Sequence, residues 1–301
     1  MDHTSLIKSL PPETKARLTT RSDTAGLRHL ALYLAAVVAS STGIILHIPL
    51  WPLLLIPQGI LLVFLFTLSH ECTHQTPFAR PWLSELCGHA IAPVLGLPFI
   101  WFRYFHLAHH KYTNDPARDP EIAHQPRPST RAEWLIYLSG WPFWRASART
   151  LWTNAFGIID APYLPARRHP AMRREARVIL GLYALAALSL FFTPLLIWLW
   201  IVPVLIGQPF LRAYLLAEHG LCPPVADMLE NSRTIFTNRL IRALAWNMPY
   251  HAEHHSVPLV PFHHLPALHG WTKAHLKSTS QGYGEFSADY ARSLRVRHPE
   301  R

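Results

Sequence analysis

Charged residues are absent from two long stretches of the chain. Residues 29–69 contain no Asp, Glu, Lys or Arg over 41 positions, and residues 178–211 contain none over 34. A membrane helix needs about 20 apolar residues, with a range of about 17–25, so each stretch is long enough for a hairpin of two spans. Proline and tryptophan at 47–52, and a proline within 192–194, suit the two turns. The pattern therefore predicts four membrane helices, at about 29–47, 50–69, 178–193 and 195–214.

A third apolar stretch is shorter and interrupted. Residues 86–102 are 17 uncharged positions broken by Pro93, Gly96 and Pro98. We expect this segment to be a re-entrant or weak span that enters and leaves the membrane on one side. A full span would place the histidines that follow it on the opposite face from the other histidine clusters.

The remaining segments are polar. Residues 1–28 are mixed in charge and contain no apolar signal-peptide core, so we expect a cytosolic N-terminal segment with a short helix near 13–21. Residues 29–276 are expected to form one membrane domain, whose cap is built from the segments between and after the hairpins. Residues 277–301 are expected to form a cytosolic C-terminal tail.

The positive charges fall on one side of this predicted topology. The chain has 28 Lys and Arg against 18 Asp and Glu. Five of the basic residues precede the first hairpin, thirteen lie between the hairpins and ten follow the second. Because basic residues are enriched in cytoplasmic loops, this side faces the cytoplasm. The excess of basic residues therefore favours contact with anionic lipid headgroups. The sequence contains no stripe of basic residues suited to binding nucleic acid.

Histidines are unusually frequent and are clustered. The chain has 20 of them, against only three cysteines, which are too few for a disulfide framework or a cysteine zinc finger. Three clusters have the spacings i, i+4 or i, i+3, i+4, which bring side chains to one side of a helix. Their members are His70, His74, His106, His109, His110, His251, His254 and His255. Neutral imidazole binds iron, zinc, copper and nickel, and eight histidines exceed what one tetrahedral ion uses, so two metals are expected.

The three clusters fit a zinc hydrolase or a metal transporter less well than a site with two metals. The first cluster resembles the HExxH motif of zinc hydrolases, with Glu71 as general base, but that chemistry leaves the second and third clusters without a role. A metal transporter would need polar residues along its spans, and the uncharged stretches argue against it. An all-histidine pair of irons beside a membrane instead favours activation of O₂ against an apolar substrate.

The order and surroundings of the clusters resemble a known superfamily. The chain carries HxxxH, HxxHH and HxxHH boxes in this order around two predicted hairpins, and the sequences 109–121 and 246–255 around the boxes match as well. Over roughly residues 30–276 the chain resembles the membrane fatty acid desaturase and hydroxylase superfamily. The resemblance implies an all-α integral membrane protein with four transmembrane helices in two hairpins and a cytosolic helical cap that carries a di-iron site.

The same resemblance assigns ligands. It implies that the eight box histidines bind two iron ions, and that one further histidine, His219, joins them from the cytosolic end of the fourth span. No catalytic residue is expected beyond the metal centre. Ligating histidines need an acceptor for their other N–H group. The nearby candidates for that role are Asn114, Asp115, Asp119, Glu121, Glu218, Asn247 and Glu253.

The implied activity is that of an O₂-dependent di-iron membrane oxidase acting on a lipid acyl chain, most simply a fatty acid desaturase that introduces a C=C bond. A hydroxylase or ketolase of a fatty acyl, carotenoid or other hydrophobic substrate remains the alternative. No His-Pro-Gly-Gly haem motif is present, so we expect a separate electron donor of the ferredoxin, rubredoxin or cytochrome b5 type. The expected location is a bacterial inner membrane, with the histidine boxes facing the cytoplasm. The segment 231–238, which includes Arg233, has no role assigned by these motifs.

Overall fold

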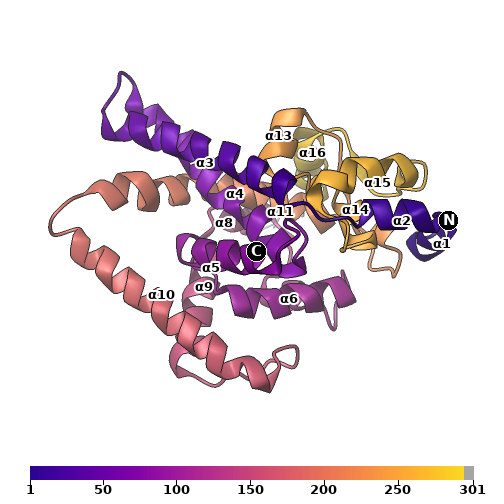
Figure 1. Cartoon of the computed structure of the whole chain (residues 1–301), viewed down its shortest axis with the longest axis horizontal. Coiled ribbons are helices and arrows are strands. Elements are labelled where there is room, and N and C mark those ends of the chain that lie inside the picture. Colours follow the sequence, from indigo (N-terminus) through magenta and orange to yellow (C-terminus); the bar gives the residue numbers. More distant parts are fainter. Residues whose placement is uncertain (295–301) are drawn as a thin grey trace, which may run out of the picture. The chain divides into compact units, whose positions relative to one another are not determined.

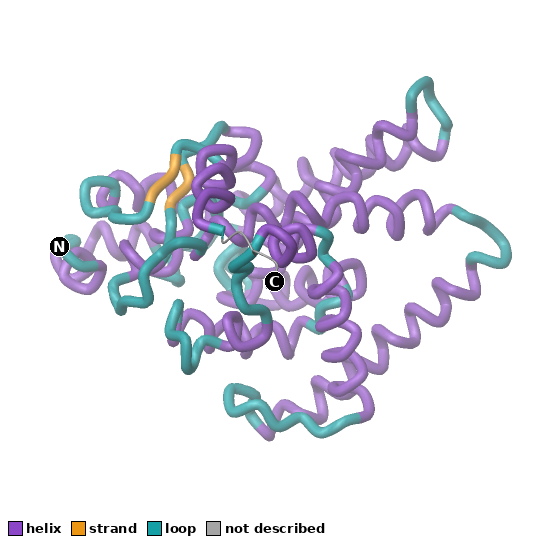
Figure 2. The backbone as a smooth tube through the Cα atoms, turned by 180° about the vertical axis from the view of Figure 1, so that it is seen from behind, coloured by secondary structure: helices purple, strands orange, loops and turns teal. Residues whose placement is uncertain are grey.

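The computed structural model describes residues 1–294 and is mostly helical, with loops and one small sheet (Figure 2). Its contacts divide the chain into two compact units. The apolar unit comprises Arg21–Leu107 and Phe143–Leu211. The polar unit comprises Met1–Thr20, Ala108–Pro142 and the residues from Arg212 on. Three long helices belong partly to each unit, and two of them carry metal-binding candidates.

The apolar unit begins with an antiparallel pair of long helices, α3 (Asp23–Ile45) and α4 (Leu55–His74), which lie side by side (Figure 1). The turn between them contains the short helix η1 (Trp51–Leu54). Within the pair, the hydroxyl of Tyr33 donates to the carbonyl of Leu61 at 2.6 Å. The amide of Gln58 donates to Ser41 at 3.0 Å, so the polar groups inside this apolar pair are satisfied.

Next come α5 (Pro81–Leu95) and α6 (Phe99–Tyr112), which meet at an angle of 100°. Gly96 ends α5 with φ at +68°, a conformation that glycine adopts without strain. The bend frees carbonyl groups at the end of α5, and side chains from three other helices bind them. The pairs are Tyr183 Oη to Pro93 O at 2.7 Å, Trp200 Nε1 to Val94 O at 2.9 Å, and Ser147 Oγ to Gly96 O. Hydrogen bonds from three other helices therefore stabilise the bend.

The unit is completed by α9 (Trp141–Phe156), η2 (Ala166–Arg168), α10 (His169–Ser189), the π-helical turn η3 (Ile197–Ile201) and α11 (Val202–His219). α4 and α11 cross at two glycines. A Cβ atom on Gly59 would overlap the carbonyl of Pro203, and one on Gly207 would overlap the carbonyl of Gly59. Small residues here let the two backbones touch, as is common between membrane helices.

Three helical segments among the described residues are long and apolar enough to cross a membrane: Pro12–Ile45, Trp51–His74 and Ile197–His219. α5 and α6 make a fourth if they form one broken span. The segment predicted as a span at 178–193 falls mainly in α10, which is not among the three. The reason is that α10 begins nine residues earlier, at His169, and its first half carries several arginines.

The polar unit is built from short helices and one small parallel sheet. The helices are α1 (His3–Ser9), α2 (Pro12–Leu18), α7 (Pro120–His124), α8 (Arg131–Leu138), α12 (Met228–Asn231), α13 (Arg239–Leu244), α14 (His251–Ser256), η4 (Phe262–His264), α15 (Leu265–Thr272) and α16 (Tyr283–Ser293). Strands β1 (Thr234–Ile235) and β2 (Thr279–Ser280) pair with Thr234 opposite Thr279. Part of the core lies between α11 and α16, where Ala217, Phe286 and Tyr290 are buried together. The predicted C-terminal tail 277–301 thus contributes β2 and α16, and its last seven residues lie outside the described part.

Candidate metal centre

Four buried histidines of the polar unit point their ring nitrogens at one another. They are His109 from α6, His219 from the end of α11, and His251 and His255 from α14. Their ligand atoms all lie within 4.8 Å of one another. The Nε2 atom of His219 lies 3.1 Å from that of His109 and 2.9 Å from that of His251. We refer to these four residues as the inner histidine group.

Two of these rings have their other nitrogen bound by an acceptor. The Nδ1 atom of His109 lies 2.9 Å from a carboxylate oxygen of Asp119, which is fully buried. The Nδ1 atom of His219 lies 3.2 Å from the backbone carbonyl of Asn231. Because a carboxylate and a carbonyl only accept hydrogen bonds, the proton of each ring must lie on Nδ1. The Nε2 atom of each ring is then left with a lone pair.

The same logic holds for one of the two rings on α14, that of His255. The hydroxyl of Thr113 donates to the carbonyl of His109 at 2.9 Å, so it accepts from Nδ1 of His255 at 3.0 Å. For the other ring, a carboxylate oxygen of Glu218 lies 3.4 Å from Nδ1 of His251 as a close acidic neighbour. Burial, reinforced by the neighbouring imidazoles, lowers the pKa of His255 well below its usual value. The ring is therefore neutral at pH 7, the form that binds metal.

Four ring nitrogens thus converge, three of them with an Nε2 lone pair fixed by the hydrogen bond on Nδ1, and this arrangement fits a metal ion. Two Nε2 lone pairs about 3 Å apart repel each other unless a cation lies among them. Imidazole nitrogens that bind one ion at about 2.1 Å, at right angles to each other, are separated by about 3.0 Å. Among the described residues, the buried Nε2 atom of His255 has no hydrogen-bond partner, as expected for a nitrogen kept for a metal. The donor set, all imidazole, suits a transition metal.

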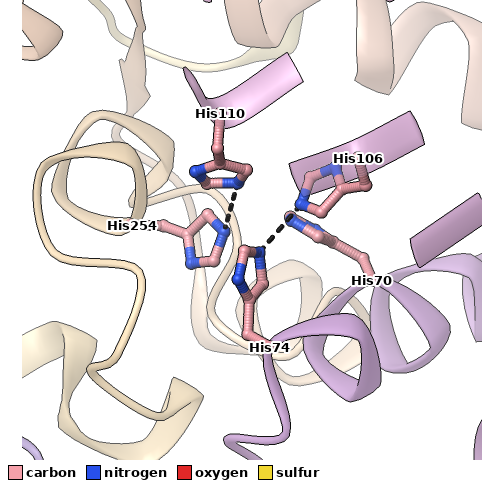
Figure 3. A group of neighbouring side chains, drawn as sticks. All are labelled: His70, His74, His106, His110 and His254. Atoms are coloured by element: carbon pink, nitrogen blue, oxygen red, sulfur yellow. Dashed lines mark hydrogen bonds between the residues drawn. The ribbon is translucent and has the colours of Figure 1, made fainter. Parts of the chain in front are cut away.

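The remaining box histidines form two smaller groups, one in each unit. In the apolar unit, His70 and His74 lie one turn apart on α4, and the Nε2 atom of His74 lies 2.9 Å from that of His106 on α6 (Figure 3). In the polar unit, the Nε2 atom of His110 lies 3.2 Å from that of His254. These nitrogens also face one another in pairs, so each group presents convergent metal-ligating atoms.

Glu71, the candidate general base of a zinc hydrolase, has a structural role. Its carboxylate is fully buried and accepts a hydrogen bond from the hydroxyl of Thr76 at 3.0 Å. Thr76 lies just beyond α4, after Gln75, whose positive φ of 58° ends the helix. The carboxylate therefore stabilises the end of the helix that carries the first histidine box.

The comparisons with known proteins agree with this geometry. The family model named fatty acid desaturase matches residues 17–287. The chain belongs to the fatty acid desaturase family. It is 25% identical over 292 residues to an sn-1 oleoyl-lipid 12-desaturase of Synechocystis sp., covering 89% of this chain and 80% of that protein. It is 28% identical over 300 residues to a dihydrorhizobitoxine desaturase of Bradyrhizobium elkanii, covering 90% and 81%. An oleate hydroxylase of Claviceps purpurea is 32% identical over 74 residues, which is 25% of this chain and 16% of that protein.

The family assignment confirms the resemblance of the histidine boxes and the prediction of an oxidoreductase of the desaturase type. Several of the predicted neighbours contact the box histidines. Besides Asp119, an oxygen of Glu121 lies 3.2 Å from Nδ1 of His109, although the Glu121 side chain is 44% exposed. Asn114 donates its backbone N–H to Asp119 at 2.8 Å. Asn114 therefore orients the carboxylate of Asp119, which in turn orients the ring of His109.

Other candidate neighbours of this desaturase lie further from the imidazoles. Asp115 pairs with Arg118 at the turn after α6. Asn247 lies in the turn between α13 and α14, with φ at 59°, and donates to the carbonyl of Phe262 at 3.0 Å. It therefore does not share a helix with His251. Glu253 is fully buried and binds groups other than the box histidines. Its carboxylate contacts Thr234 Oγ1 at 2.5 Å, Thr272 Oγ1 at 3.0 Å and His269 Nδ1 at 2.5 Å.

The segment 231–238 contains contacts that the motifs do not reveal. Asn231 supplies the carbonyl for His219, and Thr234 binds Glu253 from β1. Between them, Arg233 donates to the carbonyl of Gly220 at 2.8 Å and to that of Thr279 at 3.1 Å. The segment therefore fastens the end of α11, where His219 lies, to the small sheet. The one sequence signal was its unusual polar composition next to an apolar span.

Proposed function

We propose that this desaturase binds two iron ions through nine histidines. The first ion would be bound by the inner histidine group. The second would be bound by His70, His74, His106, His110 and His254. This division is supported by the contacts of the three histidines on α6: His109 lies beside His219, whereas His106 lies beside His74 and His110 beside His254. The observation that carries the proposal is the convergence of four buried imidazoles, three of which have an acceptor hydrogen-bonded to Nδ1.

The proposed reaction is O₂-dependent insertion of a C=C bond into a lipid acyl chain. The two irons, when bound, supply the activation of O₂ that removal of hydrogen from an unactivated carbon requires. The residues of this chain shield the imidazoles of the inner histidine group from water, fix the tautomers of three of them, and keep His255 neutral by burial. A lipid acyl chain as substrate is supported by the relative that is named an sn-1 oleoyl-lipid 12-desaturase. The alignment covers 89% of this chain and 80% of that protein.

Hydroxylation of the same kind of substrate is the second candidate. It is favoured by one observation, the similarity of a 74-residue segment to an oleate hydroxylase. The two outcomes use the same metal centre and differ in whether oxygen enters the product. Placement of the acyl carbons relative to the irons decides between them.

The proposed topology has four spans in two hairpins, with a helical cap and all histidine boxes on the cytoplasmic side of a bacterial inner membrane. Three of the four spans are supported by candidate membrane helices, and the orientation is supported by the position of the basic residues. Electrons would come from a separate ferredoxin, rubredoxin or cytochrome b5 type of donor.

Product mass tests the reaction. The iron-loaded chain is expressed in a bacterial host whose lipids are fully characterised, and the acyl chains are compared by mass spectrometry with those of a His109→Ala strain. A loss of two hydrogens, dependent on O₂ and absent from the variant, is expected. A gain of one oxygen, labelled when ¹⁸O₂ is supplied, would establish hydroxylation instead. Unchanged acyl chains under aerobic conditions with a reconstituted donor would contradict both.

A further inference from the structure

A basic concavity lies at the start of α10, in the apolar unit. Its volume is about 600 Å³, and it is lined by His169, Pro170, Arg173, Arg174, Arg177 and Val178. No acidic side chain of the described residues lines it. Glu175, which is next to Arg174 in sequence, is buried and accepts hydrogen bonds from the backbone of Phe99 and Ile100. Three arginines therefore share one small pocket without a carboxylate in its lining to neutralise them.

Two of the arginines are held in place by the end of α9. Arg177 Nε donates to the carbonyl of Ala155 at 3.0 Å. Arg173 donates to the same carbonyl at 3.3 Å and to that of Gly157 at 3.1 Å. Carbonyl groups at a helix C-terminus are unsatisfied and attract cations. The guanidinium groups are thus fixed before any ligand arrives, while the third, on Arg174, is exposed.

An exposed apolar stripe continues from this pocket along the same helix. Val178 lines the pocket and is 57% exposed, and Leu182, Leu185 and Leu188 are 45%, 63% and 53% exposed. Their spacing of four, three and three residues places them on one face of α10. Beside them, a Cβ atom on Gly181 would meet nothing within 4 Å, so this face is open. The change from basic to apolar residues occurs between Arg177 and Val178.

We infer that α10 binds an anionic phospholipid, with its phosphate in the basic pocket and an acyl chain along the stripe. Arginine binds phosphate through paired hydrogen bonds. A phospholipid has a phosphate followed by apolar acyl chains, which is the order of the basic pocket and the apolar stripe along α10. An acidic protein would bind the arginines but leave the apolar stripe uncovered. The site shares no residue with the histidine groups, so it goes beyond the proposed function and does not depend on it.

The test compares two lipids that differ only in the headgroup. The full iron-loaded chain in detergent is titrated with dioleoyl-phosphatidylglycerol or dioleoyl-phosphatidylcholine, and bound lipid is counted by native mass spectrometry. Tighter binding of the anionic lipid is expected. Arg174→Gln should weaken that binding by about fivefold, the effect of one basic residue near a lipid surface. Arg174→Lys should retain most of it, and Arg149→Gln, an exposed arginine of α9 outside the pocket, should retain all of it.

The choice of Arg174 keeps the test clear of misfolding, because the carbonyls of α9 are bound by Arg173 and Arg177. Equal binding of the two lipids, or an Arg174→Gln variant that binds like Arg149→Gln, would overturn the proposal. Displacement of the lipid by an equal concentration of inorganic phosphate would also overturn it and indicate a free-anion site. If an acidic probe protein, a plant-type ferredoxin, binds through Arg174 and no lipid preference is found, the pocket is a protein docking site and the lipid proposal is wrong.

Discussion

The Nδ1 atom of His109 lies 2.9 Å from Oδ1 of Asp119, and neither side chain is exposed by more than 3%. Asp119 is itself oriented by backbone N–H groups of Asn114 and Glu121, at 2.8 and 2.9 Å. A rigid carboxylate therefore sets both the tautomer and the direction of an imidazole in the inner histidine group. Loss of a hydrogen-bond partner of this kind typically lowers the metal affinity of a site by about 10–100-fold.

Asp119→Asn is accordingly expected to weaken metal binding by about 10–100-fold, because the neutral amide no longer favours the proton on Nδ1. Iron retained after dialysis against a graded series of chelator concentrations measures the change. Asp115→Asn is the matched control, since Asp115 lies four residues away and pairs with Arg118. Equal iron retention by both variants would mean that Asp119 acts only in the turn after α6.

His219 lies between two members of the inner group, 3.1 Å from His109 and 2.9 Å from His251, measured between Nε2 atoms. His219→Ala should therefore lower the iron content by about one ion per chain and abolish formation of oxidised lipid. His275→Ala, outside both groups of histidines, should behave like the wild type. A His219→Ala chain with full iron content and activity would show that the inner group binds metal through its box histidines alone.

Glu175 links α10 to the start of α6. Its carboxylate accepts from the N–H groups of Phe99 and Ile100 at 3.1 and 2.9 Å, and it lies 2.7 Å from Nδ1 of His89. Glu175→Gln leaves one acceptor oxygen and removes the charge, so it should lower the free energy of unfolding by about 2 kcal/mol. Thermal unfolding in detergent measures the loss, with Glu13→Gln as an exposed control. An unchanged midpoint would mean that solvent replaces the carboxylate at this helix end.

Asp227 ties the N-terminus to the polar unit. Burial alone would raise its pKa, but hydrogen bonds from the backbone of His3 and from Lys277 outweigh burial and lower the pKa below 3.8. A lowered pKa stabilises the fold above the unfolded value near 3.8, and this stabilisation disappears as the pH falls through the lower folded value. The stability difference between the wild type and Asp227→Asn should be constant from pH 7 to pH 5 and should shrink as the pH falls below 3.8. A difference that grows as the pH falls below 3.8 would contradict this assignment.

The histidine boxes could be predicted from the sequence because helical spacing alone determines which imidazoles share a face. His106 and His110 on α6, and His251 and His255 on α14, are such pairs. His219 required the family resemblance, since no spacing connects it with a box. The acceptors were harder to foresee. Asn231 binds His219 through its backbone carbonyl, which every residue type possesses, and Thr113 acts through a hydroxyl that is common in helices.

The start of α10 also differs from the start that the charge pattern predicts. The absence of charge from residue 178 on predicted a span that begins there, but Pro170 at the first turn starts α10 at His169. Backbone hydrogen bonding within a helix does not depend on side-chain charge, and arginine is a good helix former, so the arginine-rich residues belong to the same helix as the uncharged segment. An interruption of the apolar stretch was expected from the prolines and the glycine, whereas the donors that stabilise the 100° bend, among them Tyr183 and Trp200, come from distant helices.

The central claim is that this chain holds two irons through its histidines, and the metal content of the purified protein tests it most directly. Elemental analysis of the detergent-purified wild type is compared with His109→Ala, in the inner group, and His254→Ala, in the other. We expect about two irons per chain in the wild type and a loss of iron in each variant. One zinc per chain, or an active protein without bound metal, would contradict the account.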